Sequence, residues 1–259
     1  MLVDSHCHLS SEEIYPQLEQ VIKRAEGASV AYFLNAGSKF DELDKQLAIC
    51  KSFKNVFTVT GVHPHDALSY SDITADDVVE KSQNSSVVAI GECGLDYFYD
   101  FAPKDVQIKV FCEMIKASQI SGLPIVVHTR EAEEDTISIL TEAYHKKAFG
   151  GVIHSYSSDI RLAEEALKIG FYISASGMIT FKNAQTLRDS FRQIPLEKLL
   201  VETDTPYLSP VPMRGKTNEP SFVVHTAKVL ADIKEVDFET LSDKTTENFF
   251  TLFGKAKKI

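Results

Sequence analysis

The chain has 259 residues, of which 44% are hydrophobic and 25% are charged, and its formal net charge is −10. This composition is typical of a folded globular protein, and no segment is as long and as apolar as a membrane span. The acidic balance argues against a broad basic surface for duplex DNA, although it leaves room for a locally basic cleft.

The first residues and the cysteines indicate the compartment. The chain does not begin with a basic stretch followed by an apolar core and a cleavage site, so we expect a cytoplasmic protein. The four cysteines have neither the paired spacing of a metal site nor the density of a disulfide scaffold, which favours reduced thiols.

Short apolar or β-branched segments alternate along the chain with stretches of helical character. The predicted strands are residues 1–8, Val30–Ala36, Val56–Val62, Val87–Glu92, Pro124–His128, Gly150–His154, Phe171–Ala175 and Leu199–Asp204. Helices are expected at Glu12–Glu26 and Phe40–Ser52 between the first strands, and at Phe222–Ile233 and Phe238–Phe253 near the end of the chain.

The strand sequences predict the fold class. Near-continuous apolar runs such as Ile125–Val127 are typical of parallel strands that are covered on both faces. A doubly wound open sheet would give a similar alternation, but no glycine-rich phosphate loop follows the first strand. Eight repeats without a linker or a shift in composition favour an α/β fold, a single-domain (β/α)8 TIM barrel over residues 1–259 with C-terminal closing helices.

Two histidines, His6 and His8, end the first strand, and their side chains should share a face because strand side chains alternate. An isolated pair of this kind is common by chance and would normally be two surface histidines. In a barrel, however, active sites lie where the strands end, and the other predicted strand ends are also polar. These polar ends are Glu92 on strand four, His128 on strand five, His154 on strand six and Asp204 on strand eight. A core histidine would explain one of these residues but not all six, so we expect one or two divalent cations here.

Seven stretches of the sequence resemble the TatD family of metal-dependent deoxyribonucleases, which belongs to the amidohydrolase superfamily of barrels. The resemblance runs along essentially the whole chain, and it differs after His154, where Ser155-Tyr156-Ser157-Ser158 stands in place of the usual Cys, aromatic, Ser and Gly. The seven stretches are His6-Cys7-His8, Gly61-Val62-His63-Pro64-His65, Gly91-Glu92-Cys93-Gly94-Leu95-Asp96-Tyr97, His128-Thr129-Arg130, His154-Ser155-Tyr156-Ser157, Glu202-Thr203-Asp204-Thr205-Pro206-Tyr207 and Arg214-Gly215-Lys216-Thr217-Asn218-Glu219-Pro220.

The resemblance implies two divalent metal ions, which the sequence leaves open among Mg, Mn and Zn. Glu92 would bridge them as a catalytic ligand. One ion would also be held by His6, His8 and Asp204, and the other by His128 and His154. Asp204 would take the proton of the attacking water, or else serve only as a ligand, and Glu202 is a candidate orienting group behind the ligands.

The expected substrate contacts come from loops over the barrel mouth. His63 is predicted to contact a phosphate or the leaving oxygen, and His65 either assists or is a surface histidine. Arg130 offers a forked donor for phosphate, or it forms an ion pair with Glu92 or Glu131.

Two further stretches are candidate substrate contacts. Arg214 and Lys216 lie in a proline-rich loop after strand eight, where the alternative is a salt bridge from Arg214 to Glu219 that stiffens the loop. Tyr97 and the two aromatic residues after it would either stack on bases or cap the barrel top.

The sequence therefore predicts a divalent-metal nuclease that hydrolyses phosphodiester bonds of DNA or RNA. The few basic residues at the mouth favour single-stranded ends, and the resemblance implies 3′ to 5′ digestion. The alternative is a small-molecule amidohydrolase that cleaves a cyclic amide or ester with the same metals. Many such enzymes bridge their metals with a carbamylated lysine where this chain has Glu92, and the Arg214 loop suits phosphate better than a neutral ring. A catalytically silent binding scaffold is disfavoured because no ligand position is missing.

Overall fold

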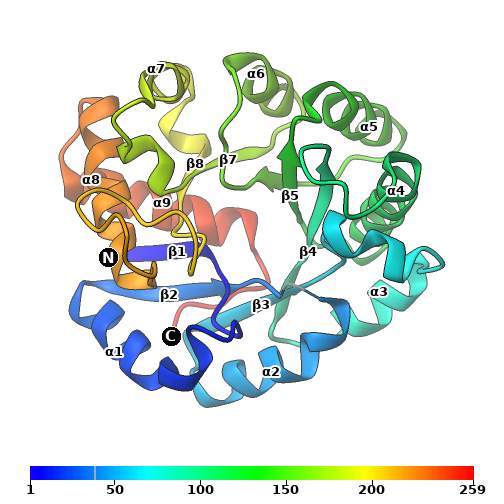
Figure 1. The fold of residues 1–259 in the computed structure, drawn as a ribbon, viewed down its shortest axis with the longest axis horizontal. Helices are drawn as coiled ribbons and strands as arrows, with labels where there is room; N and C mark the ends of the chain where they lie inside the picture. The colour runs from blue at the N-terminus through cyan, green and yellow to red at the C-terminus, as the bar shows by residue number, and fades with distance from the viewer. Residues whose placement is uncertain (38) are drawn as a thin grey trace.

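The computed structural model describes residues 1–37 and 39–259. Eight parallel strands form one sheet, and each strand pairs with the next along the chain (Figure 1). The ring closes where Cys7 bridges to Thr205, with the His8 amide donating to the Thr205 carbonyl at 2.8 Å. This arrangement confirms the predicted (β/α)8 barrel. The strands are β1 (Leu2–Cys7), β2 (Val30–Asn35), β3 (Val56–Thr60), β4 (Val87–Asp96), β5 (Ile125–Arg130), β6 (Gly151–Ile153), β7 (Tyr172–Ala175) and β8 (Leu199–Val201).

Helices follow the strands and surround them as an outer ring (Figure 1). Short 3₁₀ turns precede several of them, including η3 (Pro64–Tyr70), which leads out of β3. Among the described residues, every helix is too short or too polar to cross a membrane. The α-helices are α1 (Leu18–Gly27), α2 (Leu43–Ser52), α3 (Ala75–Ser82), α4 (Lys104–Ser121), α5 (Glu133–Lys146), α6 (Ile160–Lys168), α7 (Gln185–Gln193), α8 (Val223–Lys234) and α9 (Phe238–Leu252).

The interior of the barrel is apolar at the end where the strands begin. Val3, Val126 and Leu200 belong to one buried cluster with Phe249 and Phe253, which α9 and the residue after it supply. Helix α9 is held there by Asn248, which donates to the carbonyl of Leu199 at 2.8 Å. This end is therefore filled with side chains, and the polar groups collect at the opposite mouth.

Strand β4 is longer than predicted. It continues past Glu92 to Asp96, so Glu92 lies within the strand and not at its end. The cause is the close approach of β4 and β5 at Gly94, where an added Cβ would lie only 1.9 Å from the carbonyl oxygen of His128. Because glycine lets the two backbones come together, the ladder continues as far as the pairing of Asp96 with Arg130.

The predicted strands six and eight end earlier than expected. His154 follows β6, and Asp204 lies beyond β8 with a backbone φ of +60°, which an extended strand does not allow. All four cysteines are free thiols, and Cys7 and Cys93 are buried in the core.

Candidate active site

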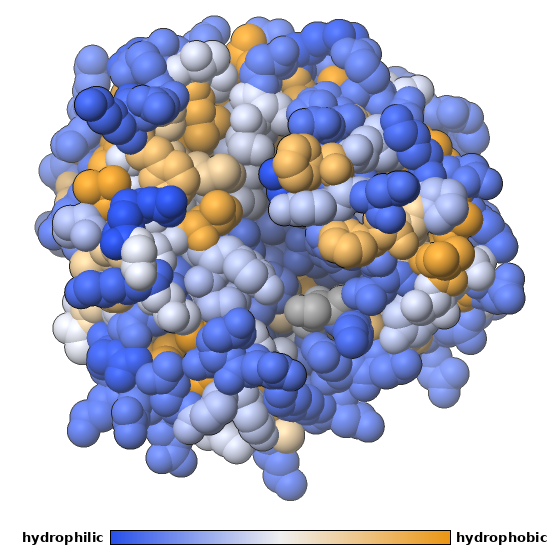
Figure 2. All heavy atoms as spheres, viewed as in Figure 1, coloured by the Kyte–Doolittle hydropathy of each residue, from blue (hydrophilic) through white to orange (hydrophobic). Residues whose placement is uncertain are grey.

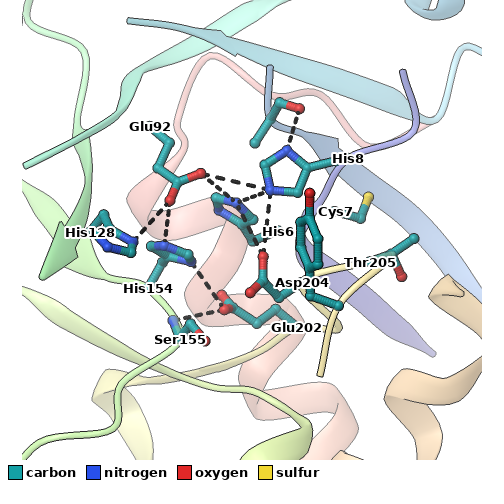
Figure 3. A network of polar contacts seen from close by, with 12 residues as sticks. His6, Cys7, His8, Glu92, His128, His154, Ser155, Glu202, Asp204 and Thr205 are labelled. Carbon is teal, nitrogen blue, oxygen red and sulfur yellow. Dashed lines mark hydrogen bonds and ion pairs between the residues drawn. The ribbon is translucent and has the colours of Figure 1, made fainter. Parts of the chain in front are cut away.

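Six side chains predicted at the strand ends meet at the mouth of the barrel (Figure 3). They come from β1 and the residue just after it, from β4, from β5, and from the residues just after β6 and β8. The Nε2 atoms of His6 and His8 lie 3.3 Å apart, so the two imidazoles converge as the alternation along a strand requires.

Glu92 lies at the centre of the group, and its two oxygens face two different sets of nitrogens. Oε2 lies 3.2 Å from Nε2 of His6 and 3.8 Å from Nε2 of His8. Oε1 lies 2.8 Å from Nε2 of His154 and 3.3 Å from Nδ1 of His128. One carboxylate therefore stands between two imidazole pairs, which is the arrangement of a bridging ligand.

Asp204 joins the first of these sets. Its Oδ1 lies 3.5 Å from Nε2 of His8 and 3.9 Å from Nε2 of His6. Burial raises the pKa of Asp204, but the hydrogen bond from His8 and the charges of His154 and His6 outweigh it, so the pKa lies below the usual range. Asp204 is therefore a carboxylate at neutral pH and is able to accept a proton.

Burial also opposes the charge on Glu92, and the surrounding imidazoles overcome it. Desolvation alone would raise the pKa of Glu92, but His154, His6 and His63 bring it well below its usual value. Burial alone would likewise lower the pKa of His154, which the carboxylates of Glu92 and Glu202 bring well above its usual value. In this structure the carboxylates and imidazoles compensate one another, a balance that bound cations would replace.

His63 belongs to the same group. It precedes η3, and its Nε2 lies 3.4 Å from Oε1 of Glu92. Burial lowers the pKa of His63 to about 4, so the ring is neutral at pH 7. Because the backbone amide of His65 donates to Nδ1 at 3.2 Å, the remaining proton belongs on Nε2, which then acts as a donor facing the centre of the site.

A carboxylate that the sequence analysis did not single out, Asp96, lies behind His128. Its Oδ2 accepts from Nε2 of His65 at 2.8 Å and from Nε2 of His128 at 3.1 Å. This contact turns Nδ1 of His128 toward Glu92. Asp96 lies four residues after Glu92 on the same strand, so the alternation of strand side chains was the signal that would have found it.

Glu202 has a similar place behind His154, as the sequence analysis considered. Its Oε1 lies 3.3 Å from Nδ1 of His154 and accepts the backbone amide of Ser155 at 2.7 Å. Oε2 of Glu202 and Nδ1 of His6 are both buried, and each lacks a hydrogen-bond partner in the part of the chain that the structure describes. Oε2 of Glu202 is an acceptor, and Nδ1 of His6 is a donor if Nε2 of His6 is the nitrogen used at the site. Because ligand atoms of His6, His154 and Glu202 lie within 4.8 Å of one another, Glu202 lies behind both imidazoles.

The donor set fits divalent cations. Three groups bring ligand atoms within 4.8 Å of one another, namely His6 with His8 and Glu92, His63 with Glu92 and His128, and His6 with His154 and Glu202. Nε2 of His154 is buried without a hydrogen-bond partner although Oε1 of Glu92 is only 2.8 Å away. The geometry of that contact is therefore not that of a hydrogen bond, as expected where both lone pairs are directed at a cation.

The predicted substrate contacts differ in how they relate to this group. His65 adjoins it through Asp96. Arg130 does not form the alternative ion pair with Glu92 or Glu131, since no described carboxylate lies within 4.0 Å of its nitrogens, and its guanidinium stacks on Phe98 instead. Tyr97 faces away, with its hydroxyl donating to Asp135 of α5 at 2.6 Å.

The proline-rich loop after β8 is ordered by its own contacts. The alternative salt bridge from Arg214 to Glu219 is wrong, because Glu219 pairs with Arg24, whose Nη2 lies 2.6 Å from its Oε2. Arg214 lies over the ring of Phe181 and donates to the carbonyl of Ser209. Lys216 is exposed, and no described polar contact joins it or Arg214 to the histidines. The substrate roles of both residues stay predictions.

One further buried carboxyl group, that of Asp4, links β1 to the segment after β8. Asp4 of β1 accepts from the hydroxyl of Thr203 at 2.6 Å and from its amide at 2.9 Å. Burial raises the pKa of Asp4 to about 8. No local pattern in the sequence marks this residue, because its partner lies 199 positions away in the chain.

Comparison with known proteins agrees with this geometry. The model of the family described as TatD related DNase matches residues 3–254. The Bacillus subtilis protein YabD, named an uncharacterized metal-dependent hydrolase, is 40% identical, and the match covers 98% of this chain and 99% of YabD. A protein of Enterobacter lignolyticus named 3′-5′ ssDNA/RNA exonuclease TatD is 31% identical, over 98% of this chain and 100% of its own length.

A solved structure has the same architecture. The crystal structure of YjjV, a TatD homolog from Escherichia coli K12, superposes with a TM-score of 0.88 at 25% identity and covers 98% of both chains. The predicted family resemblance is thereby confirmed, and the chain belongs to the family of TatD-related DNases.

Proposed function

We propose that the protein is a metal-dependent nuclease that hydrolyses phosphodiester bonds of DNA or RNA from single-stranded 3′ ends. The observation that carries this proposal is the position of Glu92, whose two oxygens face separate imidazole pairs. Two cations held by these imidazole pairs and by Glu92 would suit an in-line displacement at phosphorus. The names of the relatives at about 30% identity support both the nucleic-acid substrate and the polarity.

In this proposal the ligands divide between two divalent ions, of which Mg, Mn and Zn are the candidates. His6, His8 and Asp204 would hold one ion, His128 and His154 the other, and Glu92 both. When bound, the ions polarise a phosphoryl oxygen and lower the pKa of water toward neutrality.

The side chains then carry out the proton transfers and the positioning. The attacking water forms the new bond to phosphorus while the bond to the 3′ oxygen of the preceding nucleotide breaks, and that oxygen leaves as a hydroxyl after taking one proton from solvent. Asp204, a carboxylate at neutral pH, takes the water's proton. The Nε2–H of His63 donates a hydrogen bond to a phosphoryl oxygen or to the leaving oxygen, which suits its neutral state. Arg130 supplies a positive charge beside the strand.

We also propose that residues 1–259 form one domain and that it acts in the cytoplasm. The support for one domain is that the barrel and its closing helices use the described chain from end to end. The support for a reducing compartment is that the four cysteines are free and three of them are buried.

The test is release of mononucleotides from an end-labelled single strand. The protein is stripped with a chelator and then assayed with Mg, Mn or Zn added separately, and we expect activity to return only with cation. A small cyclic amide and a small cyclic ester are assayed beside the strand. Their hydrolysis without nucleotide release would favour the amidohydrolase alternative and contradict the proposal.

Glu92→Gln is the matched variant for this assay. A neutral amide cannot compensate the charge of two cations, so we expect loss of hydrolysis with an unchanged circular dichroism spectrum and reduced metal content by elemental analysis. A Glu92→Gln protein with full metal content and normal turnover would leave the bridging role without support.

A further inference from the structure

Three large aromatic residues are exposed in the loop that leaves β4. Phe98, Tyr99 and Phe101 keep 48%, 40% and 58% of their surface in contact with solvent. Tyr97, just before them, packs against the core, and Ala102, just after them, is buried, so the loop is anchored without them. Figure 2, drawn from the same side as Figure 1, shows apolar side chains around a central hollow. We call Phe98, Tyr99 and Phe101 the aromatic platform.

The guanidinium of Arg130 is stacked on one part of the aromatic platform. The guanidinium carbon of Arg130 lies 3.8 Å from the ring centroid of Phe98 and 4.9 Å from that of Tyr99. Within the described chain its nitrogens make no ion pair, so the fork of donors is available to a ligand. The ring of Phe101, the most exposed of the three, carries no such cation in the structure as described.

One carboxylate fixes the aromatic platform relative to the reacting centre. Oδ1 of Asp96 accepts the backbone amides of Phe98 at 3.0 Å and of Tyr99 at 3.1 Å. Its other oxygen accepts from His128, which also faces Glu92. The loop and the predicted cation ligand thus share a single buried group.

The rings also make direct contact with the edge of the site. The centroid of His65 lies 4.7 Å from that of Phe101 and 5.3 Å from that of Tyr99. Tyr99 and Phe101 are 5.4 Å apart and tilted by 33° to each other. The aromatic platform is therefore continuous with His65, which adjoins the site through Asp96.

We propose that the aromatic platform stacks a nucleobase that flanks the scissile phosphodiester, with Phe101 as the principal stacking residue and Arg130 contacting a phosphate of the same segment. This inference rests on the proposed nuclease function and adds a base-binding site to it. A protein of net charge −10 has little general attraction for a polyanion, so binding has to come from local contacts. Stacking supplies such a contact for any base, because every base has a π face.

The test combines protein variants with substrates that lack one base. The metal-loaded full chain is assayed for kcat/KM on a single-stranded oligodeoxynucleotide and on the same strand with an abasic residue at successive positions from the 3′ end. Phe101→Ala should lower kcat/KM on the intact strand by roughly tenfold, which is the lower part of the range for one stacked base. Phe101→Tyr keeps the ring face and should retain most of the activity, whereas Phe101→Leu, which keeps apolar surface alone, should not.

The decisive result is the coupling between ring and base. When the abasic residue is at the position that stacks on Phe101, kcat/KM of the wild-type protein should fall by a similar factor. On that substrate Phe101→Ala should cause no further fall in kcat/KM. Ile120→Ala, which removes a side chain that is 56% exposed at the far end of α4, is the control and should leave every substrate unchanged. Losses that multiply at every position would overturn the aromatic platform as a base site while leaving the nuclease proposal intact.

A second measurement keeps the two proposals distinguishable. Quenching of a 2-aminopurine base in the oligonucleotide reports stacking without turnover, and it should be strong for wild type and weak for Phe101→Ala. A wild-type protein that neither cuts nor binds the strand with any cation overturns both proposals. Equal quenching by wild type and Phe101→Ala overturns only the base site.

Discussion

Asp96 and Glu202 each contact one ring nitrogen of a histidine whose other ring nitrogen faces Glu92. Asp96 accepts from His128, and Glu202 lies behind His154 and beside the unpartnered Nδ1 of His6. Such contacts set which nitrogen of an imidazole is free to bind a cation. We therefore infer that Asp96 supports the binding of one cation and that Glu202 supports the binding of both.

Metal affinity is expected to follow this division. Asp96 uses all its oxygens as acceptors, so in Asp96→Asn the amide nitrogen would face N–H donors. We expect its affinity for one cation to fall about 10- to 100-fold. Glu202→Gln should lower the affinity for both cations. The measurement is cation stoichiometry by equilibrium dialysis and elemental analysis.

Asp135→Asn is the control for that experiment, because Asp135 accepts from Tyr97 away from the histidines. It should bind cations as the wild type does. Wild-type affinity in both Asp96→Asn and Glu202→Gln would show that the two carboxylates serve only the fold.

The sequence predicted the residues that lie in or just after the last part of each strand, and it missed those defined by a distant partner. His6, His8, Glu92, His128 and Asp204 were found because the ends of parallel strands meet at one mouth. The role of Asp4 depends on Thr203, which no local pattern reveals. The stacking of Arg130 on Phe98 could not be predicted either. The sequence indicated a phosphate contact for one residue and a base contact for the other, and it did not indicate that they touch.

At the scale of elements, the loop after β8 shows how a segment without regular structure is held in place. Asn218 is buried and donates to the carbonyl of Thr203 at 2.8 Å. The amide of Val211 donates to the hydroxyl of Thr180 in η4 (Gly177–Thr180). These contacts fix the backbone that carries Arg214, so its guanidinium is presented from a defined position.

We expect Arg214→Ala to lower kcat/KM on a nucleic acid strand by about fivefold, the factor that corresponds to ~1 kcal/mol for an exposed ionic contact. A small aryl phosphodiester should be hydrolysed at the wild-type rate, because the contact is to a phosphate beyond the scissile one. Arg214→Lys keeps the charge and should behave nearly as wild type. Equal losses on both substrates, together with a lower Tm, would instead assign Arg214 to stiffening the loop against Phe181.

Element boundaries were the part of the fold that the sequence predicted least well. The apolar run of β4 was visible, but its extension to Asp96 depends on the absence of a side chain at Gly94 opposite the His128 carbonyl. The predicted eighth strand was too long, because the register of β8 with β7 ends at Val201 and Asp204 takes a left-handed conformation. The end of β4 therefore depends on how closely β5 can approach Gly94, and the end of β8 depends on the backbone conformation of Asp204.

For the whole molecule, closure of the barrel and net charge together determine which substrates can reach the site. The number of repeats predicted the barrel, whereas the bridge from Cys7 to Thr205 that closes it joins residues from opposite ends of the chain. The barrel is filled by apolar side chains at one end, so substrate has access only from the mouth. The net charge is −10, and the basic residues predicted to lie near the mouth are three, Arg130, Arg214 and Lys216.

These properties predict a preference for single-stranded ends and a weak dependence on salt. Glu92 is buried, and the face drawn in Figure 2 is hollowed at its centre, which a flexible strand end can enter and a stiff duplex cannot. With roughly two or three phosphate contacts, log kcat/KM should fall with log salt concentration with a slope of about −2 on single strands. The measurement compares linear single strand, blunt duplex and closed circular single strand at several salt concentrations, and we expect rapid, slow and no digestion respectively. Efficient cutting of the circle would contradict entry by an end. A steep salt slope on duplex would reveal a basic surface assembled from residues far apart in the sequence, and the strand preference would then have a different origin.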